Sequence, residues 1–210
     1  MNHPPRVIEI KELLRDKTRK RVIFSNEGLT IEKNISFGKS TFMASADIAA
    51  FRFGVRELKG FKYSFGRQYF IELKDFKYNL YRIKFNSLYG IKNKAYYRVW
   101  ADLLQDIWDY YLSNQLNYYS EMFNIQQVFD LAGVNIYPDG ISWNKQQKIS
   151  WDKVELKSYQ SYFMIHHSDD PDQFKCCIFS IDWNAVVLQS LLKDIIREQA
   201  KVKRGIRRGF

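Results

Sequence analysis

The chain has 210 residues, of which 46% are apolar and 17% aromatic, so it can bury a core and does not have the composition of an intrinsically disordered protein. Its net charge of +10 is uneven: residues 1–100 hold 21 Lys and Arg against 9 Asp and Glu, whereas residues 101–200 hold 7 against 14. No run approaches the roughly 18 apolar residues that span a bilayer, and the N-terminus lacks the apolar segment of a secretory signal, so we expect a cytoplasmic protein.

An apolar strand, an acidic-glycine turn and a second apolar strand occur twice in the chain. The first copy is VIFSNEGLTI at residues 22–31, and the second is VNIYPDGISW at residues 134–143. Superimposing the two copies places Gly28 on Gly140, and we expect both glycines to supply the positive φ of tight hairpin turns. An internal repeat of this kind predicts two structural units.

The first unit is enlarged and basic. Residues 1–21 are expected to form an N-terminal basic arm, in which IEIKELL fits either an extra strand or a short helix. Residues 22–112 form the unit itself, with alternating strands to about Phe85 and then an amphipathic helix from about Tyr97 to Tyr111. Residues 113–133 contain no Pro or Gly before Gly133 and are predicted to be a helical connector.

The second unit, residues 134–199, is compact and acidic. After its hairpin we expect strands near residues 149–156, 161–167 and 174–181, followed by a helix that begins at the N-cap candidate Asn184. The apolar positions of the two helices match when Ala101 is placed on Ala185. A basic tail, residues 200–210, ends the chain. We therefore predict an α+β fold of two units, each a strongly bent antiparallel sheet, or partly open barrel, closed by a C-terminal amphipathic helix.

At this point the chain resembles the pleckstrin-homology (PH)-like domains of bacteria, present as a tandem pair. The resemblance is carried by Gly140-Ile141-Ser142-Trp143, by ISWDKV at residues 149–154, and by Asp182-Trp183-Asn184 before a Leu-rich helix. Because the repeated unit of sheet and helix carries no catalytic constellation, we expect a non-enzymatic binding or scaffold module of a bacterial cytoplasm. In eukaryotic relatives, basic residues near the first strands hold phosphoinositide headgroups through a Lys and a later Arg-x-Arg. The Arg-x-Arg of the first half, at residues 19–21, instead precedes the first hairpin.

The basic residues of the first unit are the candidate anion-binding group. They favour a protein partner or an anionic membrane surface, the latter at the inner face of the membrane, where each Lys or Arg contributes about 1 kcal/mol. A solvated basic surface without a partner is the alternative, and the sequence leaves homo-oligomer formation open. The candidates are Lys33, Lys39, Arg52, Arg56, Lys59 and Lys62.

Nucleic-acid binding is a second interpretation of the same basic half, because aromatic side chains can stack on bases while cations contact phosphates. Aromatic residues at alternating strand positions are also typical of a core. An enzyme of unknown class is a third interpretation, although the sequence contains no phosphate loop, nucleophile elbow or HExxH helix. The aromatic candidates are Tyr63, Phe65, Tyr69, Tyr78 and Tyr81.

One cluster in the second unit has the composition of a metal site. His166 and His167 are followed by an acidic turn at residues 169–172 and by Cys176 and Cys177. Zinc requires three or four converging ligands, but adjacent strand residues point to opposite faces. We therefore expect a structural role for the cluster, with no metal, no cofactor and no disulfide between the two cysteines.

Overall fold

The computed structural model describes residues 3–11, 18–33, 40–60, 62–89, 91, 93–144 and 147–207. The chain divides into two compact units, Met1–Ser113 (unit 1) and Asn114–Phe210 (unit 2). Both contain antiparallel sheets and a long helix, so the predicted α+β class is confirmed.

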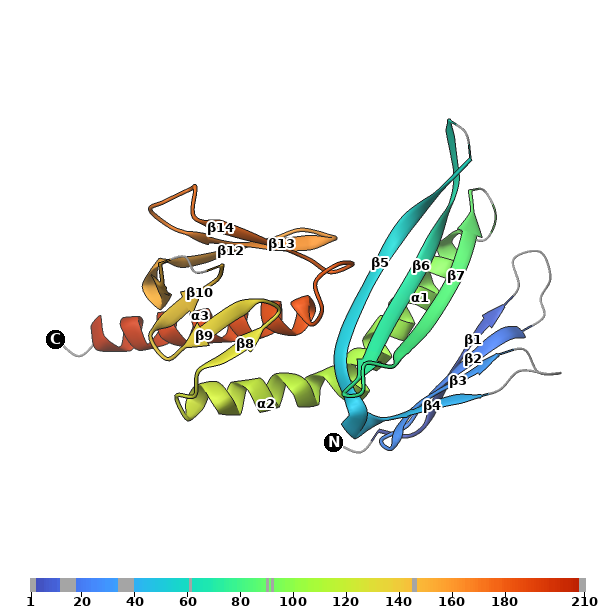
Figure 1. Ribbon diagram of the computed structural model, residues 1–210, viewed down its shortest axis with the longest axis horizontal. Coiled ribbons are helices and arrows are strands. Elements are labelled where there is room, and N and C mark those ends of the chain that lie inside the picture. Colours follow the sequence, from blue (N-terminus) through green and yellow to red (C-terminus); the bar gives the residue numbers. More distant parts are fainter. Residues whose placement is uncertain are drawn as a thin grey trace. The chain divides into compact units, whose positions relative to one another are not determined.

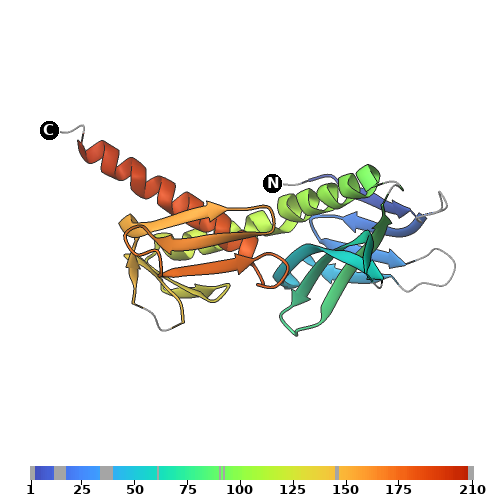
Figure 2. The ribbon, with the colours of Figure 1, turned by 90° about the horizontal axis from the view of Figure 1, so that it is seen from above.

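Unit 1 contains two antiparallel sheets. The first has four strands in chain order, and a 3₁₀ turn, η1 (Ser45–Asp47), leads into the second, which has three (Figure 1). The helix α1 (Asn93–Ile107) contacts β1 and β7, one strand of each sheet (Figure 2), and continues into a π-helical turn, η2 (Trp108–Leu112). The strands are β1 (Arg6–Lys11), β2 (Thr18–Phe24), β3 (Gly28–Lys33) and β4 (Thr41–Ala44), then β5 (Ile48–Gly60), β6 (Tyr63–Asp75) and β7 (Leu80–Leu88).

The core of unit 1 lies between these sheets and the helical segment. The ring of Phe24 from the first sheet stacks near Tyr111, and that of Tyr69 from the second lies 5.7 Å from Trp100. Other core side chains come from all three elements and are buried: Ile10, Val22, Leu29, Ile71, Leu73, Ile83, Leu103 and Ile107.

Unit 2 repeats the same order of elements. All of α2 (Ser113–Asn124) except its first residue belongs to unit 2. A four-stranded sheet, a 3₁₀ turn η3 (Trp151–Lys153), a three-stranded sheet and the helix α3 (Ala185–Arg207) follow. Among the described strands, no pair joins the two sheets of either unit into a closed barrel. The strands are β8 (Phe129–Leu131), β9 (Val134–Tyr137), β10 (Gly140–Ser142) and β11 (Ile149–Ser150), then β12 (Val154–Ser158), β13 (Tyr162–His167) and β14 (Phe174–Ile178).

The two predicted hairpins are confirmed, and their registers agree. Phe24 pairs with Leu29 in the first, and Ile136 pairs with Ile141 at the corresponding position of the second. The structural repeat thus includes the pairing of individual residues.

Several segments differ from the sequence interpretation. Within the expected basic arm, residues 6–11 form β1, because Ile8 and Ile10 alternate with exposed residues and face the core. The expected connector contains the strand β8 as well as α2, and α3 extends to Arg207, into the expected tail. The helices match by burial when Leu103, rather than Leu104, is placed on Leu188, since Leu103 and Leu188 are both fully buried.

The reason for the two repeated glycines also differs from the expectation. Among the described glycines, only Gly133 has a positive φ. Gly28 and Gly140 instead begin β3 and β10, where the next strand approaches closely. A Cβ atom on Gly28 would lie 2.2 Å from the carbonyl oxygen of Met43, and one on Gly140 would lie 2.1 Å from that of Ile149. Both positions need glycine because a backbone atom occupies the place of the side chain.

We expect Gly28→Ala and Gly140→Ala each to lower the free energy of unfolding by about 2 to 3 kcal/mol, since a backbone carbonyl cannot yield without moving its strand. Urea unfolding measures this loss. The matched control is Gly60→Ala, whose Cβ would meet only the ring of Phe65, at 3.2 Å. Equal stability changes at all three positions would show that close approach of the strands is not the constraint.

Candidate anion-binding face

The outer face of the sheet β5–β7 carries an excess of positive charge. Cross-strand pairing aligns Arg52 with Glu72 and Glu72 with Arg82, while the neighbouring Ile71 and Ile83 face the core. Between the two register shifts in the pairing of β5 with β6, the outer residues are therefore the even-numbered ones, as they are in β7. All residues of these strands are described, and their outer face holds five cations and one carboxylate: Arg52, Arg56, Lys74, Arg82 and Lys84, with Glu72. We call these six residues the basic face.

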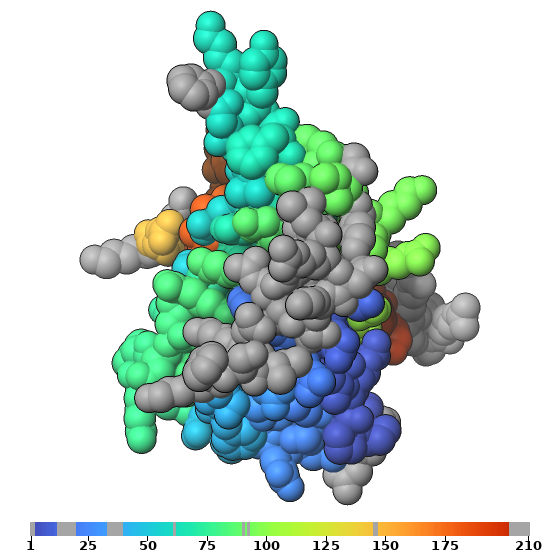
Figure 3. All heavy atoms as spheres, turned by 90° about the vertical axis from the view of Figure 1, so that its right-hand side faces the viewer, coloured from blue at the N-terminus to red at the C-terminus, as the bar shows by residue number. Residues whose placement is uncertain are grey.

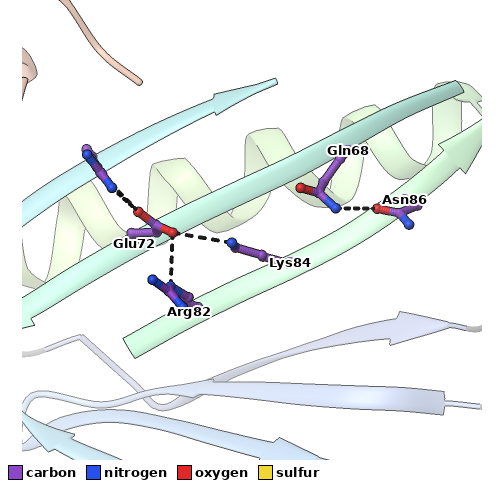
Figure 4. Close-up of polar contacts among 6 residues, drawn as sticks. Gln68, Glu72, Arg82, Lys84 and Asn86 are labelled. Carbon is purple, nitrogen blue, oxygen red and sulfur yellow. Dashed lines mark hydrogen bonds and ion pairs between the residues drawn. The ribbon is translucent and has the colours of Figure 1, made fainter. Parts of the chain in front are cut away.

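Glu72 lies at the centre of the basic face and joins its three strands (Figure 4). Its Oε2 accepts hydrogen bonds from Nε and Nη2 of Arg52, at 2.8 and 2.7 Å. Its Oε1 accepts one from Nε of Arg82 at 3.1 Å and lies 3.4 Å from Nζ of Lys84. The carboxylate side chain is 3% exposed, whereas that of Arg82 is 53% exposed. The buried Glu72 carboxylate thus holds three cationic side chains in place, and each of these side chains remains partly exposed to solvent.

The pKa of Glu72 lies below its ordinary value. Burial alone would raise this pKa, but the hydrogen bonds and positive charge of Arg52, with further contributions from Lys84, outweigh burial. Glu72 is therefore ionised at neutral pH, and its single negative charge compensates one of the three cations that surround it.

Arg56 and Lys84 extend the basic face along β6. The guanidinium carbon of Arg56 lies 4.5 Å from the centroid of the Phe70 ring, which is a cation–π contact. Lys84 pairs with Phe70 across the strands, and Phe70 is 1% exposed. The aromatic ring therefore supports the cations and is not itself available as a stacking surface.

The structure brings only two of the six sequence candidates, Arg52 and Arg56, onto the basic face. Lys59 and Lys62 lie near the turn between β5 and β6, Lys33 ends β3, and Lys39 is outside the described residues. The six therefore do not form one group. Sequence reasoning missed Lys74, Arg82, Lys84 and Glu72, although the alternation of residues 81–85 already placed Arg82 and Lys84 on one side of a strand.

The five aromatic candidates do not form one surface either. Tyr69 is 2% exposed and packs in the core. Tyr63 and Phe65 are exposed at the start of β6, whereas Tyr78 follows its end. Since β6 has 13 residues, about 40 Å separates its two ends at roughly 3.3 Å per residue.

A cavity of about 480 Å³ adjoins the basic face at Arg82. Its other described lining residues are Ile31 of β3, Thr41 of β4, Leu80 and Tyr81 at the start of β7, and Asn79 just before it. Arg82 therefore belongs both to the Glu72 network and to the lining of this cavity.

A second buried carboxylate, Asp106, lies on α1. Its Oδ1 accepts a hydrogen bond of 2.7 Å from Nη1 of Arg6, but its Oδ2 has no hydrogen-bond partner. Burial raises the pKa of Asp106, and the charges of Asp102 and Asp109 add to this, against the opposing effect of Arg6. With Leu103 placed on Leu188, Asp106 occupies the position of the buried Leu191 in unit 2.

The His–Cys cluster of unit 2 has structural contacts. His166 pairs with Glu155 across β12 and β13, and Nδ1 of His167 accepts a hydrogen bond from the backbone amide of Asp169. Cys176 is exposed and Cys177 buried, and both are free thiols. Among the described residues, no three His, Cys, Asp or Glu side chains gather as a metal site would require.

Comparisons of the chain with protein-family models, with curated proteins and with solved structures gave no match. Within the described residues, none of the helices combines the length and apolar character needed to cross a bilayer. The chemistry of the basic face is therefore the starting point for a function.

We expect Glu72→Gln to lower the free energy of unfolding by about 2 to 4 kcal/mol at pH 7, because it leaves three clustered cations uncompensated. The folded-state pKa of Glu72 is depressed, so its contribution is fully present above the ordinary value of 4.5 and disappears as the pH falls through the folded-state pKa. The loss should accordingly shrink at pH 3. Urea unfolding at both pH values measures it. Glu57→Gln, which affects only the exposed pair with Lys59, should change stability by less than about 1 kcal/mol.

The stability contribution of Asp106 changes with pH in the opposite direction to that of Glu72. Its raised pKa means that folding favours the protonated carboxyl, so the stability contribution is present at low pH and is lost as the pH rises through the folded-state pKa. We therefore expect Asp106→Asn to raise the free energy of unfolding at pH 7 by about 1 kcal/mol, with a smaller effect at pH 4. Thermal unfolding at both pH values tests this, and a variant less stable at pH 7 would show that the Arg6 ion pair outweighs the cost of burial.

Proposed function

We propose that the chain is a non-enzymatic binding or scaffold module of two PH-like units, in which the basic face of unit 1 recognises an anionic surface. The order of four strands, a 3₁₀ turn, three strands and a helix, present in both units, supports the PH-like assignment. The observation that carries the binding proposal is the Glu72 network. It holds three cations on one buried carboxylate and leaves a net positive charge at the surface.

A protein with an acidic surface and an anionic membrane, the latter at the inner face of the cell membrane, both match this chemistry. Arginines fixed on a rigid sheet lose little conformational freedom when they bind a carboxylate or a phosphate. For the basic face itself, nucleic acid is the less favoured partner, because single-strand binding combines cations with accessible aromatic rings. On the basic face the aromatic ring, Phe70, is buried.

The test is a triple variant that removes three cations, Lys84 of the Glu72 network among them, but leaves both arginines bound to Glu72. In Arg56→Gln/Lys74→Gln/Lys84→Gln, Arg52 and Arg82 still bind Glu72. At about 1 kcal/mol for each cation, we expect affinity for phosphatidylserine vesicles to fall about a hundredfold. Binding by the unchanged protein should weaken as salt is raised. Vesicle co-sedimentation and titration with polyglutamate provide the measurements.

The control is Lys153→Gln/Lys157→Gln/Lys175→Gln in unit 2, which removes the same charge elsewhere. Equal losses in the two triple variants would show that only total charge matters. If the unchanged protein binds neither vesicles nor polyglutamate at low salt, the proposed function is wrong. A gel shift that exceeds both would favour the nucleic-acid alternative instead.

A further inference from the structure

The hairpin of β5 and β6 extends beyond the rest of its sheet. The two strands pair as far as Gly60 and Tyr63, but β7 pairs with β6 only from Gly66 onward. The described residues between, 59–60 and 62–64, therefore form a two-stranded tip without a third strand beside it (Figures 1 and 3). We call residues 55–60 and 62–67 the hairpin tip region.

Large apolar side chains are exposed in this region. Tyr63 is 79% and Phe65 47% exposed, and Val55 is exposed as well. Tyr89, also exposed, lies beside them, because its backbone amide donates a 2.9 Å hydrogen bond to the carbonyl of Phe65. These side chains fill no part of the core, so the fold does not explain their apolar character.

Cations surround the exposed rings. Arg56, Lys59, Lys62 and Arg67 lie in the hairpin tip region, whose described residues contain one carboxylate, Glu57. All four cationic residues are exposed. The guanidinium carbon of Arg67 lies 5.9 Å from the centroid of the Tyr89 ring. The tip is thus an aromatic projection with a positively charged border.

This combination matches the boundary between the headgroups and acyl chains of an anionic bilayer. Aromatic residues concentrate at that depth, where one side of the ring is apolar and the other polar. Neighbouring Lys and Arg reach the negative headgroups. A projecting two-stranded tip can enter a deformable lipid surface.

We propose that the β5–β6 hairpin tip inserts Tyr63 and Phe65 into the interfacial region of an anionic lipid bilayer. The proposal deepens the proposed function and rests on it, since it selects a membrane as the anionic surface. In this arrangement Arg56, Lys59, Lys62 and Arg67 contact the headgroups around the inserted rings. Insertion would add apolar contacts to the charge attraction of the basic face.

The first experiment places an environment-sensitive fluorophore at the tip. Tyr63→Cys in a Cys176→Ser background is labelled with NBD; the remaining thiol, Cys177, is buried, and burial raises its pKa to about 12, which keeps it unreactive. We expect emission to shift to the blue and rise severalfold on phosphatidylserine vesicles but not on phosphatidylcholine vesicles. The matched control labels Phe76→Cys, an equally open position after the other end of β6, 70% exposed, and should show no change.

The second experiment measures vesicle affinity. Tyr63→Ser/Phe65→Ser should bind phosphatidylserine vesicles at least about tenfold more weakly, whereas Phe76→Ser should bind as the unchanged protein does. Both variants should keep the same affinity for polyglutamate.

The outcomes separate the two proposals. If the protein binds vesicles but the Tyr63 label stays in water and the double variant binds normally, insertion is wrong and the basic face alone accounts for binding. A Tyr63 label that responds to polyglutamate and not to vesicles would also overturn insertion, in favour of an acidic protein segment. If no anionic probe binds, both proposals are wrong.

Discussion

The ion pairs of Glu72 are the interaction on which the presentation of charge in unit 1 depends. One buried carboxylate on the central strand binds Arg52 on one side and Arg82 on the other, with Lys84 close by. Without it, like charges on three adjacent strands would repel one another and rotate into solvent. With it, the cations share defined positions and still exceed the carboxylate in charge. The arrangement therefore stabilises a cluster of cations that their mutual repulsion on adjacent strands would otherwise disperse.

The second unit shows that this face is not a consequence of the architecture. It has the same strand order, and its sheet β12–β14 pairs in the same antiparallel manner. Yet its corresponding outer positions hold Glu155 opposite His166 and Lys157 opposite Met164, so among the described residues of these strands no carboxylate joins a group of cations. The shared glycines explain the scaffold, because both are required where a neighbouring strand approaches. The charge of unit 1 is a separate property added to that scaffold.

Much of the scaffold could be predicted from the sequence. The repeat of residues 22–31 and 134–143 identified both hairpins because apolar alternation and a fixed glycine position are local signals. The role of Gly28 was not predictable, since the atom that excludes a side chain belongs to Met43, 15 positions further along the chain. Asp106 was also hidden, because a single carboxylate does not interrupt the apolar stripe of a helix.

The candidate site was predictable only in part. The basic first half of the chain points to Arg52 and Arg56, but it points equally to Lys59 and Lys62, which lie farther along the same strand and its turn. Composition shows how much charge a segment has and not which face carries it. The alternation of residues 81–85 indicates that Arg82 and Lys84 share a side. Their meeting with Glu72 depends on the register of β6 against β7, which no local pattern specifies.

An NMR titration tests the central claim most directly. Anionic bicelles or polyglutamate are added to isotopically labelled protein, and the resonances of the arginine side chains and of the β5–β7 amides are followed at low salt. We expect the largest shifts at Arg52, Arg56 and Arg82, and little change along β12–β14. Shifts spread evenly over the lysines and arginines of both units, or confined to unit 2, would contradict the assignment of an anion-binding face to unit 1.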